Sequence, residues 1–320
     1  MTTPTPPPAT GAKRIPRRWT ADLLPLALLP LTVTTACSGS GNPLNPGPPP
    51  PGTVAVGSAA YVENVLLAEI YAQVLEHTGT KVERKYNIGS REILYGLVQS
   101  GSLTVIPEYN GALLSYLDSA ATANNTAQVA QELTAKLPAT MKILDPAPAE
   151  DKNAIAVTAP TANADKLSTI EDLRPYAPRL VFGGPPEFQT RYQGLPGLQQ
   201  VYGLTFAGFK ALDTAGPITV SALKSNDVQV ATLFTTDPNV TANHFVLLTD
   251  PKHLFGAQNV IPLAYHAGLS AADEAALNAL SAKLTTPALA GMMSSVVIDK
   301  QDLDKVAHAW LVSTFPGYGG

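Results

Sequence analysis

The stretch from Asn87 to Leu117 constrains the fold of this chain more than any other part of the sequence. After Ser90, a residue type that favours the start of a helix, apolar residues recur at helical spacing. Gly101 follows where a residue with positive φ would end that helix. The short apolar segment 103–106 then predicts a buried strand. This order of helix, strand and helix predicts a unit of a parallel α/β sheet.

The end of that strand is the first candidate for a binding site. Pro107 is expected to stop the strand because proline cannot donate to a ladder, and a second helix is expected from about Ala112. The polar and aromatic residues Glu108, Tyr109 and Asn110 would then lie at the carboxyl end of a parallel strand, where open α/β sheets bind ligands. An ordinary half-buried structural tyrosine would fit the position of Tyr109 equally well.

A second stretch, Ser221–Asp237, has the same order of features, and its apolar segment ends in the polar residues Thr235, Thr236 and Asp237. Two similar units predict two lobes, with a cleft lined by strand ends from both. We expect the first lobe to comprise residues 52–155 and 247–320 and the second to comprise 156–246. Residues 154–157 are the expected first crossing between the lobes.

The N-terminal residues predict export and an anchor rather than a folded element. Basic residues precede an apolar segment, 23–33, which is too short to span a bilayer, so residues 1–36 are expected to be a signal peptide. Cys37, the only cysteine of the chain, would then be the lipidation site of a lipoprotein on the outer face of the cell membrane. A free cysteine beside an ordinary signal peptide is the alternative. The Pro- and Gly-rich residues 37–51 predict a tether.

Composition and motifs exclude several classes of function. A net charge of −4 without a basic stripe argues against a nucleic-acid partner. No nucleophile elbow, P-loop or zinc motif is present, and the five histidines are scattered, so neither catalysis nor a cofactor is expected. Asp151, Asp227, Asp237 and Asp250 could form a carboxylate site, but no hydrolase framework surrounds them.

Four segments resemble one known family. The segment GSREILYGLVQSGSLTVIPEYNG is similar to a first-lobe segment of the ProX-like substrate-binding proteins of ABC importers for glycine betaine, choline and other osmoprotectants. Residues 56–76, 180–204 and 249–263 resemble the opening strand and helix, the second-lobe ligand loop and the return crossing of the same family. The resemblance implies an α/β, type II periplasmic-binding-protein fold with two lobes joined by two crossing segments.

The resemblance also implies a binding site for a quaternary amine. In this family aromatic side chains surround the ammonium group, and an arginine binds the betaine carboxylate. By position, Tyr109 and Phe234 match aromatic box residues, Arg191 matches the arginine, and Tyr61 lies at a further aromatic position. Asn153 and Val220 stand where box tyrosines are expected, Ala59 replaces a lysine and Ala112 a threonine. The remaining candidate ligand-binding residues are Ser58, Glu187 and Thr236.

The expected role is the capture of a small-molecule ligand by a monomeric, lipid-anchored protein that delivers it to ABC permease and ATPase subunits. Because two box tyrosines and the lysine are missing, the identity of the ligand stays open. One alternative is the same fold adapted to a larger, neutral or aromatic ligand. Another is a lipoprotein that acts as a sensor and not in transport.

Overall fold

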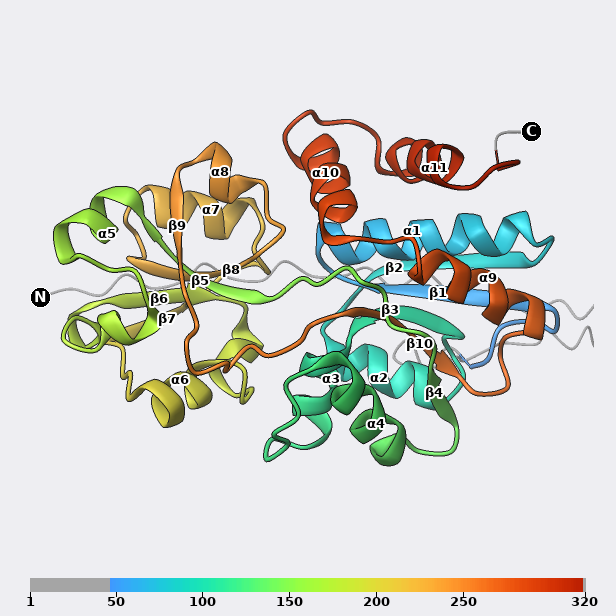
Figure 1. Ribbon diagram of the computed structural model, residues 1–320, viewed down its shortest axis with the longest axis horizontal. Helices are drawn as coiled ribbons and strands as arrows, with labels where there is room; N and C mark the ends of the chain where they lie inside the picture. The colour runs from blue at the N-terminus through green and yellow to red at the C-terminus, as the bar shows by residue number, and fades with distance from the viewer. Residues whose placement is uncertain (1–46, 319–320) are drawn as a thin grey trace, which may run out of the picture. The chain divides into compact units, whose positions relative to one another are not determined.

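Two β-sheets, each with helices packed against it, form the part of the chain that the computed structural model describes, residues 47–318 (Figure 1). We call the sheet that contains the first strand, with its helices, the first lobe, and the other sheet with its helices the second lobe. The predicted signal peptide, Cys37 and most of the predicted tether lie outside the described residues.

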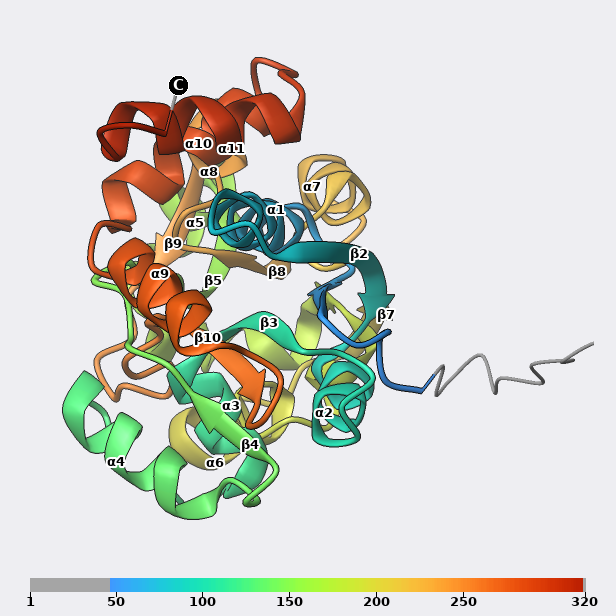
Figure 2. The same ribbon diagram turned by 90° about the vertical axis from the view of Figure 1, so that its right-hand side faces the viewer.

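The sheet of the first lobe has the strand order β2-β1-β3-β10-β4, in which β10 is antiparallel to both of its neighbours. Side chains that alternate along β1 fill two cores, because Val54 and Val56 face one side and Ala55 faces the other. Figures 1 and 2 show α1, α10 and α11 on one side of the sheet and α2 and α4 on the other. The strands are β1 (Thr53–Ala59), β2 (Lys81–Gly89), β3 (Val105–Tyr109), β4 (Met141–Ile143) and β10 (Val260–Tyr265). The helices are α1 (Val62–His77), α2 (Arg91–Gln99), α3 (Asn110–Leu117), α4 (Thr126–Lys136), α9 (Ala271–Ser281), α10 (Thr286–Val297) and α11 (Leu303–Thr314).

The sheet of the second lobe repeats this topology, with the order β7-β6-β8-β5-β9. In it β8 takes the position that β3 has in the first lobe, and the antiparallel strand β5 takes that of β10. The strands are β5 (Asn153–Thr158), β6 (Val181–Gly184), β7 (Gly208–Ala211), β8 (Val230–Phe234) and β9 (Phe245–Leu248). The helices are α5 (Ala159–Asp165), α6 (Leu195–Tyr202), α7 (Pro217–Lys224) and α8 (Asn239–Ala242), with 3₁₀ turns at Ile170–Leu173, Ala177–Arg179 and Pro186–Gln189.

The chain crosses between the lobes twice, once between β4 and β5 and again between β9 and β10. The predicted α/β fold with two lobes and two crossings is therefore confirmed. The expected boundaries do not match the sheets, however: the one between residues 155 and 156 falls inside β5, and the one between 246 and 247 falls inside β9. Residues 153–158 all belong to the second sheet, because β5 pairs along its length with β8 and β9, so the crossing precedes Asn153.

The expectation that Pro107 ends its strand was wrong. β3 continues to Tyr109, and Pro107 lies directly opposite Pro262 of β10 in an antiparallel register. Opposed residues in such a ladder alternate between pairs that exchange hydrogen bonds and pairs that do not, and two prolines fit the second kind without losing a bond. Since β3 extends to Tyr109, α3 begins at Asn110 and not near Ala112.

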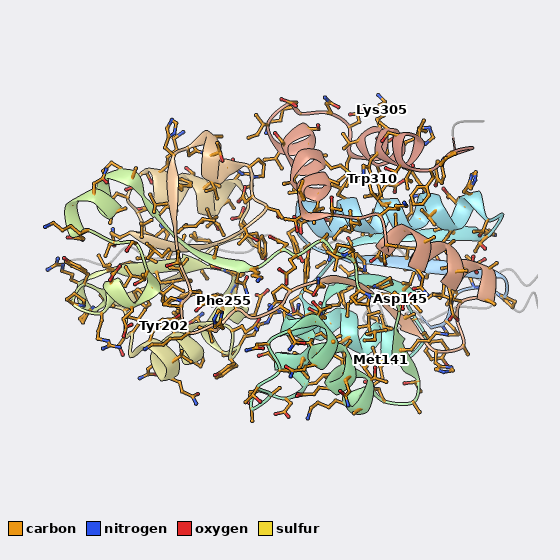
Figure 3. The ribbon with its side chains drawn as sticks, viewed as in Figure 1. Met141, Asp145, Tyr202, Phe255, Lys305 and Trp310 are labelled. Atoms are coloured by element: carbon orange, nitrogen blue, oxygen red, sulfur yellow. The ribbon has the colours of Figure 1, made fainter. Side chains whose placement is uncertain are left out.

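The return crossing is held against the second lobe before it enters the first. The carboxylate of Asp250 accepts hydrogen bonds from the Tyr202 hydroxyl and from the backbone N–H groups of Leu254 and Phe255, the latter two at 3.1 and 2.8 Å. Tyr202 and Phe255 belong to the same buried core and lie close together in the second lobe (Figure 3). The core of the second lobe thus fixes the point from which the chain leaves for β10.

Candidate functional site

A cleft of about 580 Å³ lies between the lobes and is lined by residues of both. The first lobe contributes the end of β1, the start of α2 and the carboxyl end of β3. The second contributes the 3₁₀ turn after β6 and the carboxyl end of β8. Because β3 and β8 occupy equivalent positions in the two sheets, their ends approach the cleft from opposite lobes.

Aromatic rings form one wall of this cleft. Tyr61 stacks on Phe234 across the lobes, with ring centroids 5.4 Å apart and ring planes 29° apart. Tyr109 also lines the cleft and is 5 % exposed. The ring against which Phe234 packs is that of Tyr61 and not that of Tyr109. Tyr61, Phe234 and Tyr109 are three of the six aromatic residues in the described lining, which also includes Tyr116, Phe188 and Tyr192, and aromatic faces attract cations.

Buried carboxyl groups lie beside the aromatic wall. The Tyr109 hydroxyl donates to Glu63 Oε1 at 2.7 Å, and the Thr236 hydroxyl donates to Glu63 Oε2, which joins the two lobes. Asp151, on the first crossing, accepts from the Thr236 N–H at 3.0 Å. Burial raises the pKa of Glu63, and burial together with the charge of Glu63 raises the pKa of Asp151 well above its usual range. The two carboxyls therefore favour sharing one proton over carrying two charges.

Asn64 of α1 connects the end of β1 to β3, where the ladder between these strands stops. Its side-chain oxygen accepts from the Ala59 N–H at 2.7 Å, and its amide nitrogen donates to the Pro107 carbonyl at 3.1 Å. The same amide nitrogen lies 3.5 Å from the hydroxyl of Tyr61. One buried side chain thus fixes both strand ends and the aromatic residue between them.

Both arginines of the cleft are paired with glutamates. Arg191 Nε and Nη2 each donate to an oxygen of Glu92 at 2.9 Å, so this ion pair joins the lobes. Arg91, whose side chain is 12 % exposed, donates to both oxygens of Glu108 at 2.7 and 2.9 Å. Although burial lowers the pKa of Arg91, the Glu108 carboxylate outweighs this and raises it above its usual value. Each guanidinium group is thus charged and has its charge balanced by a glutamate carboxylate.

The predicted site residues fall into two groups. Six of them line the cleft, namely Tyr61, Tyr109, Asn153, Glu187, Arg191 and Phe234. Ser58 does not, because β1 continues to Ala59 and the fully buried Ser58 hydroxyl accepts from the Asn87 N–H at 2.9 Å. Thr236 lies behind the wall, in a neighbouring cavity that Val220 also lines. Cys37 lies outside the described residues.

Sequence reasoning missed Glu63, Asn64, Arg91 and Glu92. Arg91 and Glu92 stand in the segment on which the family resemblance rests, and a charged pair just after a helix cap at a strand end could have singled them out. Glu63 and Asn64 carried no such signal, because their partners are supplied by β3 and by the second lobe.

Residues 47–318 contain neither a helix suited to crossing a membrane nor a group of side chains suited to a metal ion. No helix in this range is both long and apolar enough to cross a membrane. No group of three or more histidine, cysteine or acidic side chains in this range is arranged to hold a metal ion.

Solved structures resemble this chain over most of its described length. A crystal structure described as a glycine betaine/carnitine/choline ABC transporter has a TM-score of 0.62 at 21 % identity and covers 81 % of this chain and 98 % of its own. A choline-binding protein of an ABC transporter, in complex with choline, also has a TM-score of 0.62, at 17 % identity, with 81 % of this chain and 88 % of its own covered. At these identities the likeness shows the fold, which is that of the type II periplasmic binding proteins.

Sequence comparison extends this likeness to a family. The glycine betaine-binding protein YehZ of Escherichia coli (strain K12) is 30 % identical over 273 residues, which cover 81 % of this chain and 89 % of YehZ. Residues 52–313 match the OpuAC family model, described as the substrate binding domain of ABC-type glycine betaine transport system. The chain therefore belongs to the OpuAC family of ABC transport substrate-binding proteins.

Proposed function

We propose that this chain captures a quaternary amine, such as glycine betaine or choline, in the cleft between its lobes and delivers it to an ABC permease with its ATPase subunits. The aromatic wall made by Tyr61, Phe234 and Tyr109 is the observation that carries the proposal. A quaternary ammonium group cannot donate hydrogen bonds and is held instead by the faces of aromatic rings. The buried carboxyl groups behind this wall favour a positive charge in front of it.

The proposal places the protein outside the cytoplasm. Residues 1–36 would be removed on export, and lipid attached to Cys37 would hold a monomer on the outer face of the membrane through a tether, residues 37–51. Family membership supports an extracytoplasmic position. The basic and apolar N-terminal residues, and the cysteine that follows them, support the anchor.

Isothermal titration calorimetry with choline, glycine betaine and the neutral tert-butyl analogue of choline tests the proposed ligand class. At least one of the two amines should bind, and the neutral analogue should bind more weakly because it lacks the charge. Phe234→Leu should weaken binding of that amine about tenfold through the lost aromatic face. Phe315→Leu, a matched change outside the cleft, should leave affinity unchanged.

The same titrations distinguish the proposal from the alternative of a neutral ligand. Equal or tighter binding of the neutral analogue would favour a cleft adapted to neutral ligands. Failure of both amines to bind a folded protein would refute the proposed ligand class.

A further inference from the structure

The two arginines of the cleft carry no unbalanced positive charge. Arg191 is bound by Glu92 through two contacts of 2.9 Å, and Glu187 lies 3.7 Å from the same guanidinium. Arg91 is bound by Glu108 in the same bidentate way. A ligand carboxylate that approached Arg191 would therefore meet two protein carboxylates already there, and like charges repel.

Acidic residues outnumber basic ones in the described lining of the cleft. Four acidic residues line it, Glu92, Glu108, Asp151 and Glu187, against two arginines, and neither lysine nor histidine is among the lining residues of the part that the structure describes. After the two bidentate pairs are taken out, Glu187 remains, together with the one negative charge that Asp151 shares with the buried Glu63. The cleft as a whole thus favours a ligand with net positive charge.

Asp151 adds a buried carboxyl group beside the cleft to this general preference. The side chain is 3 % exposed, and its Oδ1 accepts from the Thr236 N–H at 3.0 Å and from the Thr235 hydroxyl at 3.1 Å. Its Oδ2 has no hydrogen-bond partner among the described residues. A positive charge in the adjoining cleft would stabilise the one negative charge that Asp151 and Glu63 keep when they share a proton.

We propose that the cleft selects a quaternary ammonium cation without a carboxylate, of the choline type, over a zwitterionic betaine, and that Glu92 sets this preference by occupying Arg191. The inference rests on the proposed function, since it concerns which quaternary amine the same cleft accepts. The aromatic wall can bind the quaternary ammonium group of either ligand. The discrimination comes from the carboxylate of the betaine, which must displace Glu92 and break a contact between the lobes.

The test compares choline and glycine betaine by calorimetry on the wild-type chain and on Glu92→Gln. Wild type should bind choline at least about tenfold more tightly than glycine betaine. Glu92→Gln frees the charge of Arg191 and removes one negative charge, so glycine betaine should bind more tightly and choline more weakly. The Glu92 side chain is 38 % exposed, so the variant is expected to fold. Glu274→Gln removes the same charge from a pair with Lys142 outside the cleft and should change neither affinity.

A second variant tests the contribution of the Asp151 charge. Asp151→Asn keeps the size of the side chain and should weaken the binding of choline more than the binding of glycine betaine. Circular dichroism checks that the variant folds. The inference would be overturned if Glu92→Gln left the ratio of the choline and glycine betaine affinities unchanged, or if wild type preferred glycine betaine. Either result would leave the proposed function standing. Absence of binding by both amines would overturn the proposed function and this inference with it.

Discussion

Replacing Asn64 by alanine should destabilise the protein more than an average substitution on a helix. The side chain is 2 % exposed and satisfies two buried backbone groups, the Ala59 N–H and the Pro107 carbonyl. Leaving both without a partner costs about 2–6 kcal/mol, at about 1–3 kcal/mol for each group. The higher helix propensity of alanine returns only about 0.5 kcal/mol. Because Asn64 borders the cleft, water can reach the site, and we expect the lower half of that range.

The assay is urea unfolding followed by circular dichroism, with Gln73→Ala as the control. Gln73 is an amide on the same helix, and its side-chain nitrogen contacts Glu69 and the Asp304 carbonyl near the surface. Its removal should therefore cost less than about 1 kcal/mol. Glutamine already has a higher helix propensity than asparagine, so the control gains less from the change to alanine, and the difference between the two variants slightly understates the lost buried bonds.

A third variant separates the two bonds of Asn64. Asn64→Asp keeps an acceptor for the Ala59 N–H but places a carboxylate against the Pro107 carbonyl. It should destabilise the protein at neutral pH and recover stability in acid, where the protonated carboxyl can donate again. A loss below about 1 kcal/mol for Asn64→Ala, or an Asn64→Asp loss that does not depend on pH, would refute this account of the strand junction.

Three further predictions concern the return crossing, the contact between the lobes and the anchor. Gly111→Ala should cost about 1–3 kcal/mol in urea unfolding, because a Cβ there would lie 2.1 Å from the Ala257 carbonyl oxygen, whereas Gly96→Ala, with nothing within 4 Å, should not destabilise. Although partial burial raises the pKa of Glu92, Arg191 lowers it from 4.5 to about 2, so the stabilisation from this pair should be present above pH 4.5 and lost as the pH falls towards 2. Glu92→Gln should lack this part of the pH dependence of stability, and identical acid unfolding curves for the two proteins would contradict the assignment. Mass spectrometry should find acyl groups on Cys37 of the mature protein and none on Cys37→Ala, and an unmodified Cys37 on mature wild type would rule out the lipid anchor.

Short sequence patterns were enough to predict the helices and strands whose formation depends on neighbouring residues. The helix at 91–99, the strand that follows it and the repeat of that unit in the second lobe all rest on apolar spacing and on residues that start or end helices. Tyr61, Tyr109 and Phe234 could be placed in the cleft because strand ends and the family resemblance pointed to the same positions.

The features that the sequence did not reveal depend on partners far away in the chain. Pro107 can stay within a strand because Pro262 lies opposite it, and the sequence near Pro107 does not indicate that partner. Glu92 looked like an ordinary charge in the first turn of a helix, yet it binds Arg191 of the other lobe. Asn64 sits in an apolar stretch of α1, where its two backbone partners cannot be inferred from spacing.

The position of β10 between β3 and β4 has a consequence for the order in which the chain can fold. Both neighbours of β10 are synthesised before the whole second lobe, and β10 is synthesised after it. The strands of the second lobe, by contrast, are contiguous in sequence, so that lobe can close its sheet while the first sheet is still split into two parts with open edges. The first lobe depends on contacts of long sequence separation, which form slowly. A nascent chain thus completes its first lobe only near the end of synthesis, and a truncation after β9 would leave the second sheet whole and the first one broken.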